Sequence, residues 1–329
     1  MTLKIGILGC SKVAEKNFFS YIENSSKYKL HIIGSRSPDK AKEWANKYNS
    51  PKYGNYDDVL NSDIDVIYIS LPISLHEEWS IKAANMGIHI ICEKSSTISY
   101  ASAKRMIEAS QKNNIRLLEA FSFRFHPQHN KILQLINESP TKIYNFYGYY
   151  GMPSFPKNDI RWNKSLGGGV LNDVACYPVC ASRILLKGEP KTISSSMVID
   201  EESGVDIKVD VLATFEDGKT AFISCGFDHY YQSKYSLWGD NSKFSSERAY
   251  AVPRTYETKI TCDKDDHLTE YTIGPIDQFA QMFDYFSNVL QGQEGTDFNM
   301  ENDLLSQSIY MEAIRISASQ NKVVSLNDL

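Results

Sequence analysis

A run of small residues follows the first apolar stretch of the chain and has the spacing of a phosphate-binding turn. Gly9, Ser11 and Ala14 take the three small positions of a G-x-G-x-x-G/A pattern, with a predicted strand before them and a predicted helix after them. Ser11 departs from the usual middle glycine, although its hydroxyl can donate a hydrogen bond to a phosphate. The residues that we expect to bind a dinucleotide here are Gly9, Cys10, Ser11, Lys12 and Val13. The alternative is an ordinary turn between a strand and a helix.

The residues after the second predicted strand bear on which dinucleotide binds. An NAD site usually places Asp or Glu here to hold the ribose hydroxyls, and positions 34–38 contain neither. Ser35 and Arg36 stand there instead, with Lys40 one helical turn further on. Because a guanidinium binds phosphate through a bidentate fork, these residues suit the 2′-phosphate of NADP(H). The alternative is a solvated surface arginine.

A third group of candidates lies at the carboxyl end of the apolar run 66–71. Ser70, Leu71 and Pro72 are placed there, and His76 follows in the next predicted helix. Open α/β sheets bind their ligands at the carboxyl ends of parallel strands. We therefore expect these residues in the cofactor site, with His76 as a cofactor contact or a structural residue rather than a proton relay.

The elements that position these candidates alternate between short apolar strands and helices. This alternation predicts a doubly wound parallel sheet of the Rossmann type over residues 1–121. The expected strands are 3–9, 30–34, 66–71, 88–92 and 115–121, and the expected helices are 13–23, 38–48, 74–86 and 99–113.

The pattern changes near residue 122. Residues 122–329 are expected to form an α+β domain with a large open, mainly antiparallel sheet that binds substrate and pairs subunits. The expected strands are 142–150, 192–199, 206–215, 220–227, 235–239, 258–262 and 268–273, followed by helices over 277–290 and 301–319.

Composition and charge exclude several classes of protein. A length of 329 residues suggests about two domains, and 42% hydrophobic with 23% charged residues is typical of a globular protein. The net charge of −5 and the lack of a basic run argue against nucleic-acid binding. We find no apolar stretch near the roughly 18 residues of a membrane helix, and Met1–Ile5 leads straight into a strand pattern, so we expect neither a membrane anchor nor a signal peptide.

The six cysteines do not form a metal-binding pattern. Cys176 and Cys180 are one helical turn apart, and a zinc site would need two further ligands at recognisable spacing. We interpret them as buried helix cysteines, expect no metal, and place the protein in a reducing cytoplasm.

Four further motifs occur in order along the chain. Pro72–His76 and Glu93-Lys94 each follow a buried strand, and the stretches 124–128 and 167–178 come later. This series resembles the Gfo/Idh/MocA oxidoreductase family over essentially the whole chain. Within that family the chain is most similar to the NADP-dependent sugar 3-ketoreductases of nucleotide-linked deoxysugar biosynthesis. The stretches that carry this similarity are 126–129, 159–161, 176–178 and 226–229.

The resemblance implies that Lys94 and Tyr177 lie near the nicotinamide and act on a sugar carbonyl. Two positions depart from the family pattern. Ser95 replaces the proline of the common Glu-Lys-Pro motif, and Tyr177 stands where many members have histidine. Tyrosine is typical of the glucose–fructose oxidoreductase, dihydrodiol dehydrogenase and ketoreductase branches, so it points away from inositol dehydrogenase.

Reduction of a ketone needs a hydride at carbon and a proton on the developing alkoxide. Tyr177 suits the role of proton donor, and a neighbouring ammonium such as that of Lys94 would ease the transfer by stabilising the phenolate. Lys94 is equally able to donate the proton or to polarise the carbonyl. The alternative for Tyr177 is a packing role in a helix.

The remaining site candidates rest on the resemblance or on helical spacing. Asp173 lies four residues before Tyr177 and is expected to orient substrate hydroxyls or the lysine, or else to stabilise a helix start. Arg161 and Trp162 are expected near the cofactor or substrate, or else in an exposed loop. Glu93 belongs to the cofactor motif. Weaker substrate candidates are Arg124, His126 and His229, and scattered cations for a diphosphate are Arg183 and Arg254.

These observations predict an NADP(H)-dependent oxidoreductase that reduces the carbonyl of a keto sugar nucleotide. One alternative is a pyranose or dihydrodiol dehydrogenase of the same family. Another is a non-catalytic NADP(H) sensor, which would not need both Lys94 and Tyr177. We also expect a homodimer or homotetramer that associates through the second sheet.

Overall fold

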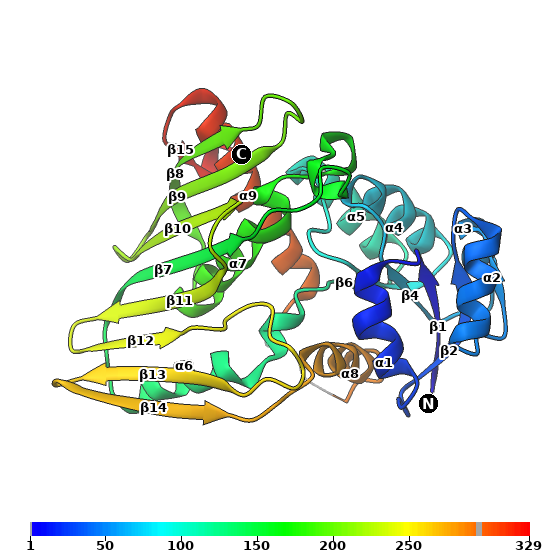
Figure 1. The fold of residues 1–329 in the computed structure, drawn as a ribbon, viewed down its shortest axis with the longest axis horizontal. Coiled ribbons are helices and arrows are strands. Elements are labelled where there is room, and N and C mark those ends of the chain that lie inside the picture. The colour runs from blue at the N-terminus through cyan, green and yellow to red at the C-terminus, as the bar shows by residue number, and fades with distance from the viewer. Residues whose placement is uncertain (1, 294–297) are drawn as a thin grey trace. The chain divides into compact units, whose positions relative to one another are not determined.

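The computed structural model describes residues 2–293 and 298–329 (Figure 1). Two compact units are present. Unit 1 comprises Met1–Phe121 and Phe279–Leu305, and unit 2 comprises Ser122–Gln278 and Ser306–Leu329. In the described ranges we find no helix with the length and apolar character that crossing a membrane requires.

Unit 1 contains a six-stranded parallel sheet. Its strands are β1 (Leu3–Leu8), β2 (Tyr28–Gly34), β3 (Tyr53–Gly54), β4 (Val66–Ile69), β5 (His89–Cys92) and β6 (Leu117–Glu119). The order β3-β2-β1-β4-β5-β6 is that of a dinucleotide-binding Rossmann fold, and its connections reverse direction between β1 and β4. All four residues of β4 are buried, as expected of a strand covered on both faces.

Helices connect these strands, and several of them begin at polar caps. They are residues 12–22, which include α1 (Phe19–Ile22), α2 (Pro38–Lys47), α3 (Tyr56–Leu60), α4 (His76–Asn85) and α5 (Tyr100–Lys112). The side chains of Ser37 and Ser99 accept hydrogen bonds from the backbone of Lys40 and Ser102, which satisfies amides that a helix start leaves unpaired. The expected strands and helices of residues 1–121 are present, with β3 and α3 in addition.

Unit 1 also includes α8 (Gln278–Leu290) from Phe279 onward and the first residues of α9 (Met300–Gln320). Phe283 is fully buried, and its ring lies 5.2–6.1 Å from the rings of Tyr21, Tyr28 and Tyr68. Glu301 accepts two hydrogen bonds from the Arg116 guanidinium, at 2.9 and 3.1 Å. The sequence grouped 279–305 with the second domain because an amphipathic helix does not reveal which sheet its apolar face covers.

Unit 2 is built on a nine-stranded sheet of mixed, mostly antiparallel pairing. Its strands are β7 (Ile143–Met152), β8 (Pro190–Ile199), β9 (Asp206–Phe215), β10 (Thr220–Phe227), β11 (Gln232–Gly239), β12 (Ser242–Ser246), β13 (Thr258–Lys264), β14 (His267–Ile273) and β15 (Val324–Ser325). The order is β14-β13-β12-β11-β7-β10-β9-β8-β15, with β7 and β10 parallel at its centre. The predicted fold class is confirmed.

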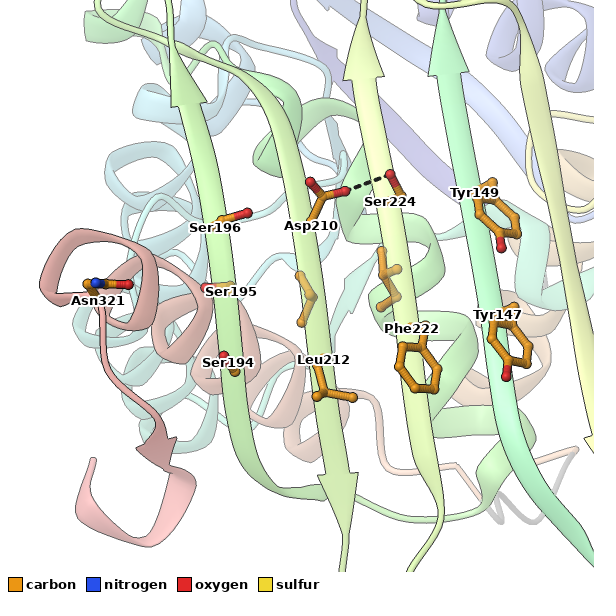
Figure 2. Close-up of a pocket in the computed structure, with 12 residues that line it drawn as sticks. Tyr147, Tyr149, Ser194, Ser195, Ser196, Asp210, Leu212, Phe222, Ser224 and Asn321 are labelled. Carbon is orange, nitrogen blue, oxygen red and sulfur yellow. Dashed lines mark hydrogen bonds between the residues drawn. The ribbon is translucent and has the colours of Figure 1, made fainter.

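The two faces of this sheet differ. On one face, Tyr150 of β7 contacts Tyr177 of α7 (Cys176–Leu186). On the other face, Tyr147 and Tyr149 stand beside Phe222 and Ser224 of β10, as Figure 2 shows. The helix α6 (Pro127–Glu138) also belongs to unit 2 and was not predicted.

We predict that Phe283→Ala lowers the free energy of unfolding by about 3–5 kcal/mol, because it opens a cavity among the aromatic rings of unit 1. Denaturant unfolding followed by fluorescence measures the change. The exposed Tyr53 provides the control, since Tyr53→Ala removes little buried surface. Equal losses in the two variants would contradict the assignment of α8 to the core of unit 1.

Candidate active site

The turn after β1 requires glycine at its first position. Gly9 has φ +100°, and a Cβ atom there would stand 2.6 Å from the carbonyl oxygen of Ser70. Its N–H donates to the carbonyl of Gly34 at 2.9 Å. The turn therefore lies against the ends of both neighbouring strands, at the point where the sheet order reverses. A dinucleotide's phosphates fit such a close-packed backbone turn.

The hydrogen bonds of Ser11 account for a serine in place of the usual middle glycine of the motif. Its Oγ accepts a hydrogen bond from the N–H of Ala14 at 3.0 Å, so it caps the first helix. The same hydroxyl hydrogen-bonds to that of Ser70. Serine thus joins the turns after β1 and β4. Lys12 and Val13 follow in the first helical turn and are exposed.

The carboxyl end of β2 presents one buried and two exposed polar side chains. Ser35 is buried and accepts a hydrogen bond from the N–H of Ser37 at 3.2 Å. Arg36 and Lys40 are exposed, and Lys40 donates to the carbonyl oxygen of Cys10 at 3.0 Å. Burial raises the pKa of the Cys10 thiol to about 11, although the charge of Lys40 opposes this, so the thiol is neutral at physiological pH.

His76 links the loops after β4 and β5. Its ring is buried, with Nε2 2.8 Å from the carbonyl oxygen of Leu71 and Nδ1 3.1 Å from that of Ser95. Burial lowers the pKa of His76 to about 4, so the ring is neutral near pH 7. This geometry fits the structural alternative and not a proton relay. Pro72 directly precedes the short helical turn Ile73–Leu75.

The backbone around Lys94 is held by buried carboxyl groups. Glu93 accepts a hydrogen bond from the Tyr68 hydroxyl at 2.5 Å and one from the N–H of Lys94 at 3.3 Å. Glu119 accepts from the N–H of Ser96 at 2.7 Å. Burial raises the pKa of Glu93, and the Tyr68 hydroxyl and the charge of Lys94 act against that rise. The peptide bond between Lys94 and Ser95, at the position of the family's proline, is cis.

In unit 2, three aromatic rings hold the ring of Tyr177. The centroids of Phe123, Tyr150 and Tyr250 lie 5.7, 5.5 and 5.8 Å from that of Tyr177. Tyr250 is fully buried, and its hydroxyl donates to the carbonyl of Lys234 at 3.3 Å. The orientation of Tyr177 is therefore set by packing on its own sheet.

The triple glycine before the Tyr177 helix makes room for a carboxylate. Gly169 has φ +114°, and a Cβ atom there would stand 2.1 Å from Oδ1 of Asp206. The other oxygen of Asp206 accepts a hydrogen bond from the N–H of Leu171 at 2.5 Å. Asp206 thus caps the helix that carries Asp173 and Tyr177. This role of Asp206 could not be predicted from the sequence, because Asp206 comes from β9, 35 residues away from Leu171.

Asp173 and Arg161 form an ion pair beside this helix start. Nε of Arg161 donates to Oδ2 of Asp173 at 2.6 Å, and Nη1 donates to Asp159 at 3.0 Å. Trp162 is buried and donates from Nε1 to the carbonyl of Phe155 at 3.4 Å. The expectation of an exposed loop pair is therefore wrong for Trp162. Residues 171–175 form a π-helical turn, so the angular step from Asp173 to Tyr177 differs from that of an α-helix.

The weaker candidates also belong to unit 2. Nη1 of Arg124 lies 3.7 Å from the sulfur of Cys180. His126 is the N-cap of α6 and accepts from the N–H of Gln128, as a turn-fixing residue would. His229 is exposed, with Nδ1 2.6 Å from the carbonyl oxygen of Phe227. Arg183 is buried and paired with Glu189 at 2.7 and 2.8 Å, so it is a structural cation and does not suit a free diphosphate.

The structure therefore brings together two groups of candidates. The cofactor candidates of unit 1 lie at the carboxyl ends of β1, β2, β4 and β5. Tyr177, Asp173, Arg161 and Trp162 lie around the start of one helix in unit 2. Cys176 and Cys180 are buried thiols of α7, as expected. In the part of the chain that the structure describes, we find no group of His, Cys, Asp and Glu suited to a metal ion.

Comparisons with known protein families agree with this arrangement. Residues 3–121 match the family model "Oxidoreductase family, NAD-binding Rossmann fold", and residues 139–245 match the GFO/IDH/MocA C-terminal domain. The chain belongs to the GFO/IDH/MocA oxidoreductase family. The expectation drawn from the sequence motifs is confirmed.

Individual members of the GFO/IDH/MocA family match over nearly the whole chain. A dTDP-3,4-didehydro-2,6-dideoxy-alpha-D-glucose 3-reductase from Actinomadura kijaniata is 27% identical, with 96% of each chain covered. The D-xylose 1-dehydrogenase (NADP(+)) 2 of Haloferax volcanii is 26% identical over 99% of this chain and 100% of its own. The crystal structure of KijD10, a 3-ketoreductase from Actinomadura kijaniata in complex with NADP and TDP-benzene, has a TM-score of 0.92, 26% identity and coverage of 97% and 98%.

We predict that the free energy of unfolding falls as the pH is lowered from 7 to 5, in part because of His76. Its pKa is about 4 in the folded protein and 6.5 in the unfolded chain. The unfolded chain therefore binds more protons below pH 6.5, and stability is lost as the pH falls. His76→Gln should reduce this loss by about 1–2 kcal/mol in urea titrations at the two pH values.

The exposed His267 supplies a matched control, since His267→Gln should leave the pH dependence as in the parent protein. An undiminished pH dependence in His76→Gln would contradict the neutral, buried state of that ring.

Proposed function

We propose that the protein is an NADP(H)-dependent reductase of a keto sugar linked to a nucleoside diphosphate. The observation that carries the proposal is the match over nearly the full chain to a dTDP-sugar 3-reductase, in a chain that retains Lys94 and Tyr177. The KijD10 complex with NADP and TDP-benzene supports both the cofactor and the class of substrate. The cytoplasm is the proposed compartment.

The cofactor's phosphates bind at the turn of Gly9, Cys10 and Ser11, in this proposal, and its 2′-phosphate at Ser35, Arg36 and Lys40. The turn leaves no space for a side chain at Gly9, and the arginine after β2 is exposed. The cofactor also contacts the loops after β4 and β5 in this proposal, through Leu71, Pro72, Glu93 and Lys94. The buried ring of His76 connects these two loops. The nicotinamide supplies or accepts the hydride when the cofactor is bound.

Tyr177 and Lys94 transfer the proton to or from the substrate oxygen in this proposal. Packing against three rings keeps the phenol in one orientation, and the Glu93 and Glu119 hydrogen bonds fix the backbone on both sides of Lys94. A positioned donor lowers the barrier more than a mobile one does, because its orientation is already established. Either side chain can donate the proton, with the other stabilising the charge that develops.

Substrate hydroxyls bind near Asp173 in this proposal. Arg161 holds the Asp173 carboxylate, so that carboxylate accepts hydrogen bonds from a fixed position. The buried Trp162 follows Arg161 in the chain. Arg124 and His229 are the other substrate candidates of unit 2.

The alternative function is the NADP-dependent oxidation of a free pyranose. The Haloferax volcanii D-xylose 1-dehydrogenase is nearly as similar as the dTDP-sugar reductase, so this alternative has specific support. A dihydrodiol substrate and a non-catalytic NADP(H) sensor are the remaining alternatives.

We predict that Tyr177→Phe lowers kcat for the NADPH-dependent reduction of a keto sugar nucleotide about 100- to 10,000-fold, because the variant loses the hydroxyl that handles the proton. Absorbance of the nicotinamide measures turnover, with the keto sugar generated in situ. NADPH affinity should be unchanged, since the cofactor candidates lie mainly in unit 1.

A panel of free pyranoses with NADP⁺ distinguishes the alternatives. Turnover of free sugars alone would favour the pyranose dehydrogenase, and NADPH binding without turnover of any carbonyl would favour the sensor. Tyr150→Phe is the matched control, because it removes a neighbouring hydroxyl and keeps the ring that packs on Tyr177.

The proposed oligomer associates through the sheet face of unit 2 that is opposite α7. Leu212, Phe222 and Trp238 are 38%, 39% and 56% exposed on this face, and Tyr147 stacks on Phe222 at 5.1 Å. Figure 2 shows Tyr147, Leu212 and Phe222 with Ser194–Ser196 and the Asp210–Ser224 hydrogen bond. These residues line a shallow pocket on the sheet. An apolar face of this kind suits a second copy of the chain, since a two-fold interface uses the same patch twice.

We predict that Phe222→Lys shifts the protein toward monomer in sedimentation velocity, because a charge would be buried at the interface. Tyr53→Lys places the same charge on an exposed aromatic residue of unit 1 and should leave the association unchanged. A parent protein that sediments as a monomer would contradict the proposed oligomer.

A further inference from the structure

The guanidinium of one arginine of unit 2 lies close to two tyrosine rings and has no carboxylate partner among the described residues. Arg248 follows β12, and the central carbon of its guanidinium is 4.7 Å from the ring centroid of Tyr231 and 5.4 Å from that of Tyr256. Its Nε is buried and makes no hydrogen bond within the described ranges. The residue is half-buried overall. Such a cation is costly to hold in place unless something binds it.

Two other arginines of unit 2 are paired with carboxylates. Arg161 pairs with Asp159 and Asp173, and Arg183 pairs with Glu189. Arg254 is exposed, and its guanidinium packs on no aromatic ring of the described residues. Arg248 therefore combines a restrained position with donors that the described part of the chain does not use.

The backbone at Arg248 is fixed by a buried amide. Gln128 is fully buried, and its Nε2 donates to the carbonyl oxygens of Arg248 and Ala249, both at 3.2 Å. Its Oε1 accepts from the hydroxyl of Ser246 at 2.9 Å. The N–H of Ala249 donates to the carbonyl of Ser233 on β11 at 2.6 Å. These bonds hold the segment 246–249 against the sheet.

A series of ring contacts connects Arg248 to Tyr177 within unit 2. Tyr231, which packs on the guanidinium, is 6.4 Å from the ring of Tyr150, and Tyr150 is 5.5 Å from that of Tyr177. The arginine is thus a few side chains away from the proposed proton donor. In a nucleotide-linked sugar, the diphosphate is separated from the reacting carbonyl by part of one sugar ring.

We propose that Arg248, packed against Tyr231 and Tyr256, binds the diphosphate of the substrate and so selects a nucleotide-linked sugar over a free one. This inference rests on the proposed function. A guanidinium donates two parallel hydrogen bonds to phosphate oxygens, and stacking on aromatic rings leaves the in-plane N–H groups available. The two tyrosines and the Gln128 bonds orient the donors before the substrate arrives, which lowers the entropy lost on binding.

The test measures the affinity for dTDP by calorimetry, with the protein saturated with NADPH. Arg248→Gln should weaken dTDP binding by about 10- to 100-fold, the effect of losing a charge-assisted pair of hydrogen bonds. Arg248→Lys should give a smaller loss, because it keeps the charge and loses the fork. Tyr256→Leu, which removes one stacking ring, should weaken binding with Arg248 still present.

Arg254→Gln removes the other cation that the sequence offered for a diphosphate, and this variant should bind dTDP as the parent protein does. NADPH affinity and the thermal midpoint should be unchanged in Arg248→Gln, which excludes misfolding as the cause of the loss. Raising the salt concentration should reduce the difference in dTDP affinity between Arg248→Gln and the parent protein.

Three outcomes, each in a protein that reduces keto sugar nucleotides, would overturn the assignment while the proposed function stands. The first is an unchanged dTDP affinity in Arg248→Gln. The others are a loss of dTDP affinity in Arg254→Gln alone and equal losses of dTDP affinity in both variants. A parent protein that binds no dTDP and oxidises free pyranoses would overturn both the assignment and the proposed function.

Discussion

The carboxylate of Asp206 at the start of the Tyr177 helix is the contact on which the rest of the unit 2 site depends. It accepts a backbone N–H where the helix would otherwise leave an amide unpaired, and it occupies the space that a side chain at Gly169 would fill. Burial raises the pKa of Asp206, and the helix N–H groups oppose that rise. The position of the helix start then determines where Asp173 and Tyr177 stand.

The same principle operates in unit 1, where buried polar groups fix the loops that follow the parallel strands. Ser11 joins the turns after β1 and β4, His76 joins the loops after β4 and β5, and Glu93 holds the Lys94 backbone. Ser11 and His76 each have a partner in a different loop, and Glu93 also accepts a hydrogen bond from Tyr68 of β4. The edge of the sheet is therefore organised before any ligand binds, which is a general requirement for precise binding.

The sequence was sufficient for the fold class, because period and composition are local signals. The buried run 66–71 and the small residues at Gly9 and Ala14 identify a Rossmann unit without further information. Contacts between distant segments could not be predicted in this way. Asp206 meets Leu171 from another strand, and an apolar helix such as α8 fits either sheet. The sequence offered Arg183 as a cation for a ligand. Its ion pair with Glu189 depends on the path of the chain after α7, which residue spacing does not reveal.

The return of residues 279–305 to unit 1 means that neither unit is encoded by one uninterrupted stretch of the gene. A fragment ending at residue 121 would contain all six strands of its sheet but would lack Phe283 and Glu301, leaving the rings of Tyr21, Tyr28 and Tyr68 without their cover. The two units therefore cannot be separated by a single cut in the chain. A chimaera that swaps the cofactor specificity of this enzyme has to carry the late helical segment along with the first 121 residues.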